Sequence, residues 1–164
     1  MIVDTSVLVA LLLREPDAPV LTRLMSTAQA RRLSSASYVE LGAVIDGRRD
    51  PALSGALDAI LRVLHTEVVS FTVEQARIAR AAYQQFGRGS GHPAQLNMGD
   101  CFAYALARDL GEPLLFKGRD FALTDIEIAL EPDPRKRLSE VVAAYMAGAT
   151  PPGASTGGPL AAGA

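Results

Sequence analysis

Apolar and polar residues follow two periods that alternate along the chain. Short apolar segments that favour buried strands occur at 1–4, 32–35, 67–71, 113–116 and 126–129. Apolar residues three or four positions apart predict helices at 7–13, 17–28, 38–47, 51–64, 72–86 and 100–110. Strands that alternate with helices form a parallel sheet with helices on its faces. We therefore expect an α/β fold, a three-layer α/β/α sandwich with a central parallel sheet.

The periodic pattern ends near residue 131, and this divides the chain into three parts. We expect one compact domain over 1–131 and an additional C-terminal helix over 132–147, where apolar residues return at helical spacing. Residues 148–164 consist almost entirely of Gly, Pro, Ala, Ser and Thr, which predicts a disordered tail.

Composition narrows the class of protein. Hydrophobic residues make up 49% of the 164, enough for a packed core, and no apolar run reaches the ~18–20 residues that cross a bilayer. The apolar N-terminus has an acid at position 4 and no basic residues before it, so we expect neither a signal peptide nor a membrane anchor. A single cysteine, Cys101, fits a reducing cytoplasm, and a net charge of −2 argues against a strongly basic nucleic-acid wrapper.

Four acidic residues lie where the predicted strands end or the predicted helices begin. Asp4 ends the first strand, and Glu40 lies in the first turn of the helix after the second strand. Asp100 begins a later helix, and Asp120 follows the strand at 113–116. Because these ends of parallel strands share one edge of the sheet, the four carboxylates are expected to converge.

Converging carboxylates need a cation. Two of them at ~4 Å repel by about 4 kcal/mol at an effective dielectric constant of ~20, and each raises the pKa of the other. A ligand set made only of oxygen suits Mg²⁺ or Mn²⁺, which polarises a phosphodiester and lowers the pKa of an attacking water. No Ser–His or Cys–His pair competes as a covalent nucleophile, so the pattern indicates metal-dependent phosphoryl chemistry.

Three of the four acids also have an ordinary structural explanation when each is taken alone. The helix dipole favours an acid in a first turn by ~0.3–1 kcal/mol, which would account for Glu40 or Asp100 alone. Asp120 alone would be a turn residue. Asp4 is the least ordinary of the four, because an Asp that follows a buried strand seldom has a structural role, and the joint pattern is stronger than any single member.

Four blocks of the sequence resemble the PIN-domain family, and within it the VapC-type toxin ribonucleases. The blocks are Met-Ile-Val-Asp-Thr-Ser at 1–6, the Ser-x-x-Glu ending at Glu40, and the segments 99–107 and 115–121. The resemblance covers roughly residues 1–130. It implies a flavodoxin-like fold and a hydrolase that cuts single-stranded RNA internally, as the toxin of a type II toxin–antitoxin system.

The same resemblance implies roles for the acids. Asp4 and Asp100 would be the primary ligands of Mg²⁺ or Mn²⁺, and Glu40 and Asp120 would complete the site directly or through water. The hydroxyl of Thr5 or Ser6 would support the metal site.

An acidic site must still hold a polyanion, and four basic residues lie near the predicted loops. Phosphates of the RNA could contact the side chains of Arg14, Arg88, Lys117 and Arg119. The resemblance further implies a homodimer and a cognate small antitoxin that blocks the acidic site with a basic side chain.

Two other classes of protein compete with the nuclease hypothesis. A non-catalytic PIN-like module would bind RNA or an antitoxin without hydrolysis, but such a module usually lacks one of the acids. A haloacid-dehalogenase-like phosphatase needs a second Asp two residues after the first, where this chain has Ser6. A response-regulator receiver needs a phosphoacceptor Asp on the third strand, and the segment 67–71 ends without one.

Overall fold

The computed structural model describes residues 1–129. The expected helix at 132–147 and the expected tail at 148–164 lie outside the described residues. They stay predictions, as does the domain boundary at residue 131. Within the described part of the chain, no helix has the length and apolar character needed to span a membrane.

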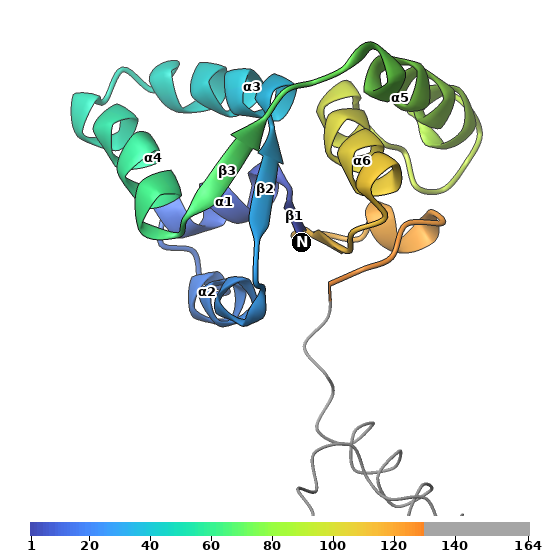
Figure 1. Cartoon of the computed structure of the whole chain (residues 1–164). Coiled ribbons are helices and arrows are strands. Elements are labelled where there is room, and N and C mark those ends of the chain that lie inside the picture. The colour runs from blue at the N-terminus through green and yellow to red at the C-terminus, as the bar shows by residue number, and fades with distance from the viewer. Residues whose placement is uncertain (130–164) are drawn as a thin grey trace, which may run out of the picture. The chain divides into compact units, whose positions relative to one another are not determined.

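Four parallel strands form the sheet in the order β3-β2-β1-β4 (Figure 1). The strands are β1 (Ile2–Val3), β2 (Arg31–Ser34), β3 (Thr66–Val69) and β4 (Leu114–Leu115). The chain moves outward from β1 through β2 to β3, and then returns to the other side of β1 for β4. The strand order therefore reverses between β1 and β4, and ligands of parallel sheets bind beyond the carboxyl ends of strands at such a reversal.

Helices cover both faces of the sheet, so the α/β/α sandwich expected from the sequence is confirmed (Figure 1). One face packs on α1 (Thr5–Leu12), α2 (Ala18–Thr27), α3 (Ser35–Asp46) and α4 (Pro51–Val63). The other face packs on α5 (Val73–Phe86) and α6 (Met98–Leu110). Because consecutive residues of a strand point to opposite faces, Ile2 belongs to the second core and Val3 to the first.

Helix starts differ from the sequence predictions where a nearer polar side chain reaches the free N–H groups. Asp4 caps α1, because its Oδ2 accepts from the Ser6 N–H at 2.9 Å, so the helix begins at Thr5 and not at residue 7. Ser34 caps α3 through the Ala36 N–H at 3.3 Å, so α3 begins at Ser35. Glu40 consequently lies in the second turn of α3 and not in the first, which removes the simple dipole explanation for it.

The strand expected at 126–129 is reduced to an isolated bridge between Leu114 and Ile128. Two backbone hydrogen bonds of 2.9 Å hold it, one from the Leu114 N–H to the Glu127 carbonyl and one from the Ala129 N–H to the Leu114 carbonyl. Since β4 is only two residues long, it offers too short an edge for a fuller ladder. The loop before the bridge contains a short 3-10 helix, η1 (Phe121–Leu123).

Candidate active site

An open pocket of about 470 Å³ lies where the strand order reverses, beyond the carboxyl ends of β1 and β4. Three of the four predicted acids line it: Asp4 after β1, Asp100 in the first turn of α6, and Asp120 in the loop after β4. These residues are far apart in the sequence, and the parallel topology brings them together. We refer to this cavity as the acid pocket.

Asp4 is 3% exposed, and its two oxygens have different surroundings. Oδ2 accepts from the Ser6 N–H at 2.9 Å and from the Ser6 hydroxyl at 2.5 Å. Oδ1 is buried and has no hydrogen-bond partner. Burial raises the pKa of Asp4 and the charge of Asp120 adds to this, against the lowering by the Ser6 hydrogen bonds. One oxygen of Asp4 therefore has a structural role and the other is left for a ligand.

Asp100 forms a capping box with Asn97. Its Oδ2 accepts from the Asn97 N–H at 2.7 Å, and the Asn97 Oδ1 accepts from the Asp100 N–H at 3.0 Å. Burial raises the pKa of Asp100 to about 6, and the charges of Asp4, Asp120 and Glu40 act in the same direction. The helix start thus fixes the Asp100 carboxyl among other acids that oppose its ionisation.

The other two acids differ in how they are held. Asp120 is exposed, and although it precedes η1 its side chain makes no capping hydrogen bond. Glu40 does not line the acid pocket; its carboxylate lies against the backbone of Gly99, and its Oε2 is buried without a hydrogen-bond partner. Burial and the charge of Asp4 both raise the pKa of Glu40, so this carboxylate is close enough to the site to affect it.

The donor chemistry of these residues fits a hard divalent cation, although the site is not preformed. Within residues 1–129, no three His, Cys, Asp or Glu side chains are arranged as a ready set of metal ligands. Burial raises the pKa values of Asp4, Glu40 and Asp100, and repulsion by the charges of neighbouring acids raises them further, while the Asp4 Oδ1 and the Glu40 Oε2 are buried without hydrogen-bond partners. A bound Mg²⁺ or Mn²⁺ would reverse that repulsion and allow them to approach.

The predicted phosphate contacts separate into two groups. Lys117 lines the acid pocket, and exposed Arg119 lies in the same loop. The Lys117 ammonium already binds the carboxylates of Glu15 and Asp17, the latter at 3.1 Å. Arg14 instead lines a separate groove between α1, α2 and α4.

The remaining predicted contact, Arg88, is exposed beyond the end of α5 and does not line the acid pocket. Two residues that do line it, Asn97 and Glu15, were missed by the sequence reasoning. The Asn-x-x-Asp spacing at 97–100 is a signal for the capping box that would have indicated Asn97. No local signal points to Glu15, since its partner Lys117 is 102 positions away.

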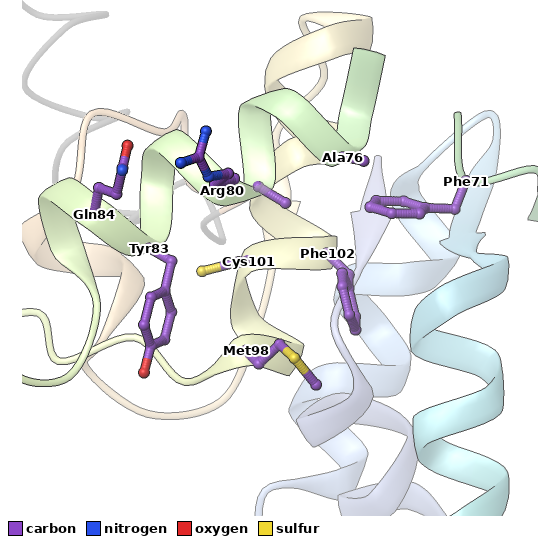
Figure 2. A pocket seen from close by; sticks show the side chains of 9 residues that line it. Phe71, Ala76, Arg80, Tyr83, Gln84, Met98, Cys101 and Phe102 are labelled. Atoms are coloured by element: carbon purple, nitrogen blue, oxygen red, sulfur yellow. The ribbon is translucent and has the colours of Figure 1, made fainter. Parts of the chain in front are cut away.

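A second cavity, of about 590 Å³, lies between α5 and α6 and is mostly apolar (Figure 2). The rings of Phe71 and Phe102 meet edge to face at 5.2 Å at one end, and Tyr83 lies at the other. Burial raises the pKa of the Cys101 thiol in its wall to about 12, so this sulfur is not a reactive thiolate. None of the described residues that line this second cavity is acidic, in contrast to the acid pocket.

Comparisons with known proteins agree with this geometry. The PIN domain model matches residues 1–127. Ribonuclease VapC28 of Mycobacterium tuberculosis is 53% identical over 131 residues, which are 80% of this chain and 98% of that protein.

Two solved structures share the fold at low identity. The crystal structure of Mycobacterium tuberculosis VapC20, described as a sarcin-ricin loop cleaving toxin, aligns with a TM-score of 0.62 at 19% identity, covering 80% of this chain and 98% of that one. A toxin–antitoxin complex from Klebsiella pneumoniae aligns with a TM-score of 0.56 at 18% identity, covering 74% and 89%.

The fold and the acidic pocket beyond its strand-order reversal define an α/β domain of the PIN class, and the chain belongs to the PIN-domain family. Its similarity to VapC28 extends over nearly the whole of that ribonuclease. Family membership and this similarity confirm the sequence-based predictions of a PIN domain and of a VapC-type toxin ribonuclease.

Proposed function

We propose that this chain cuts single-stranded RNA internally, with Mg²⁺ or Mn²⁺ held by Asp4 and Asp100, as the cytoplasmic toxin of a type II toxin–antitoxin pair. The main support is the acid pocket itself, which is lined by acids from three distant segments and where the buried Asp4 Oδ1 has no hydrogen-bond partner. A non-catalytic binding module would not need several acids in one pocket, where their charges repel one another.

Each residue has a defined part in the proposal. Asp4 and Asp100 are the primary ligands, and Glu40 and Asp120 complete the site directly or through water. When bound, the metal polarises the phosphodiester and lowers the pKa of the attacking water. Asp120, exposed and unconstrained by a capping bond, is free to accept a proton from that water.

Supporting residues hold the site and the substrate. The Ser6 hydroxyl donates to the Asp4 Oδ2 and accepts from the Lys117 N–H at 3.0 Å, so it links the start of α1 to the loop after β4. Thr5, beside it, is half-buried at the rim of the same pocket. In the proposal, phosphates that flank the cut bond are contacted by Arg119 and by Lys117, which exchanges its carboxylate partners Glu15 and Asp17 for the phosphate.

We extend the proposal to two protein partners. A small antitoxin that brings a basic side chain into the acid pocket would pair with the unpartnered Asp4 Oδ1 in place of a metal ion. Leu11, Ile60 and Leu64 line a groove of about 530 Å³ between α1, α2 and α4 that suits an apolar segment of such a partner. The second partner is another copy of this chain, in a homodimer.

The decisive experiment measures cleavage of single-stranded RNA with Mg²⁺ or Mn²⁺, and Mn²⁺ uptake by calorimetry, for the wild type and Asp4→Asn. We expect cleavage in metal and none in EDTA, and a more than ~100-fold slower variant with weakened Mn²⁺ binding, because the charge is lost while the Ser6 bonds to position 4 can persist. Glu67→Gln, at the opposite end of the sheet, is the matched control and should cleave normally. An Asp4→Asn protein that cuts at the wild-type rate would refute the assignment.

A further inference from the structure

We infer that Gly99 is a positioning residue: its missing side chain leaves the space in which the Glu40 carboxylate lies beside the acid pocket. The inference rests on the proposed function, because it concerns the same site. It adds a residue that has no functional group of its own and that acts only through another side chain.

The Glu40 carboxylate approaches Gly99 more closely than any other residue type at position 99 would allow. A Cβ built on this residue would lie 2.0 Å from the Glu40 Oε1, 2.2 Å from Oε2 and 2.3 Å from Cδ, whereas real Cβ atoms essentially never approach another heavy atom within 3.0 Å. All three atoms belong to the free end of a flexible side chain. An alanine at position 99 would therefore displace the Glu40 carboxylate and leave the backbone of α6 in place.

Backbone conformation does not explain the glycine. Gly99 is the second residue of α6, where Ala forms helix better than Gly, and its φ is not in the left-handed region. Gly55 in α4 is a useful contrast, because a Cβ there would have no atom within 4 Å. The glycine at 99 thus weakens the helix, and the space it gives to Glu40 is the compensating feature.

The contact between Glu40 and Gly99 joins helices from the two faces of the sheet. Glu40 belongs to α3 and Gly99 to α6, and these helices pack on opposite faces. Gly99 immediately precedes Asp100, so a carboxylate lying on it is kept at the helix start that carries a primary ligand. Displacing Glu40 would remove its charge from the neighbourhood of Asp4 and Asp100 while both of those residues stay as they are.

A double-mutant cycle tests the inference on the full chain, with Gly99→Ala, Glu40→Ala and the double variant. Mn²⁺ affinity is measured by calorimetry and cleavage with RNA. We expect Gly99→Ala to lose about 10–100-fold in Mn²⁺ affinity, as Glu40→Ala does, and the double variant to lose no more than either one. Gly55→Ala is the control and should bind Mn²⁺ like the wild type.

The thermal midpoint in EDTA gives a second readout that needs no activity. Introducing Gly99→Ala into the Glu40→Ala protein should raise the midpoint, as Gly55→Ala does, because the space is then empty. The same Gly99→Ala change in the wild type should raise it less or lower it. Wild-type Mn²⁺ affinity and cleavage in Gly99→Ala, or losses that multiply in the double variant, would overturn the inference. A wild type that neither binds Mn²⁺ nor cleaves RNA would overturn the proposed function and this inference with it, even where the midpoints show the Gly99–Glu40 contact.

Discussion

Acidic side chains at the amino end of the sheet differ in their partners from Asp4 and Glu40 at the carboxyl end. At the amino end, Glu112 accepts from the Met1 amino group at 2.5 Å and also binds Arg32, which lies 3.4 Å from the Glu67 carboxylate. At the carboxyl end, Asp4 and Glu40 each keep a buried oxygen without a hydrogen-bond partner. Glu112 and Glu67 are thus paired with cations of the chain, whereas burial and the charges of neighbouring acids raise the pKa values of Asp4, Glu40 and Asp100.

This difference separates acids that are neutralised within the chain from acids that are left for a ligand in the proposed site. A paired acid contributes to folding, whereas a group of unpaired acids weakens the metal-free fold and binds cations. Substitutions at the two ends should therefore separate activity from stability.

The largest expected effect is on cleavage. Asp100→Asn should slow RNA hydrolysis by more than ~100-fold, because the charge of a proposed primary ligand is lost while the amide oxygen still accepts from the Asn97 N–H. Glu112→Gln, the same change at the opposite end, should cleave normally when folded. Comparable losses in both variants would show that the two ends do not differ in function.

A smaller loss is expected when an acid is kept but its support is removed. Ser6→Ala takes away the hydroxyl that donates to Asp4 and accepts from the Lys117 N–H, and we expect cleavage to fall about 10–100-fold. Ser26→Ala is the control, since the exposed Ser26 hydroxyl bonds only within its own helix. Unchanged cleavage in Ser6→Ala would mean that Asp4 needs no support from this hydroxyl.

Stability should change with opposite sign at the two ends. Glu112→Gln should lower the free energy of unfolding by about 1–2 kcal/mol, because Arg32 and the Met1 amino group lose a half-buried anionic partner. Asp100→Asn should raise it at pH 8 in EDTA. Urea unfolding measures both, and the same sign in both variants would contradict the comparison.

The last effect is a pH dependence of the metal-free protein. The pKa of Asp100 is about 6 in the fold and ~3.9 in the unfolded chain, so the folded state binds the proton more tightly. Its contribution to stability is complete below pH ~4 and is lost as the pH rises through 6. The full shift corresponds to about 3 kcal/mol, which solvent screening of the partly exposed carboxyl reduces to about 1–2 kcal/mol.

Asp100→Asn should remove this part of the decline when unfolding in EDTA is followed from pH 4 to pH 8. A variant that declines as steeply as the wild type would place the titrating group elsewhere.

The sequence was most informative where a feature depends on period and topology. Strand and helix order and the shared pocket of Asp4, Asp100 and Asp120 follow from local pattern together with the parallel sheet. Helix starts were less predictable, because several polar residues compete for the same free N–H groups near Asp4 and Ser34. The contacts Glu40–Gly99 and Lys117–Glu15 could not be predicted from the sequence, since each joins distant elements through side chains whose final positions depend on the packed fold.

The two oxygens of the Asp4 carboxylate have different surroundings, and this limits which mutations at position 4 could inactivate the chain and leave it folded. One oxygen caps the first turn of α1, so Ala at this position would remove the proposed metal ligand and loosen the helix start together. Asn removes the negative charge and keeps an acceptor for the same N–H. Silencing the proposed site at this position without loosening α1 therefore requires a residue whose side chain still accepts from the Ser6 N–H.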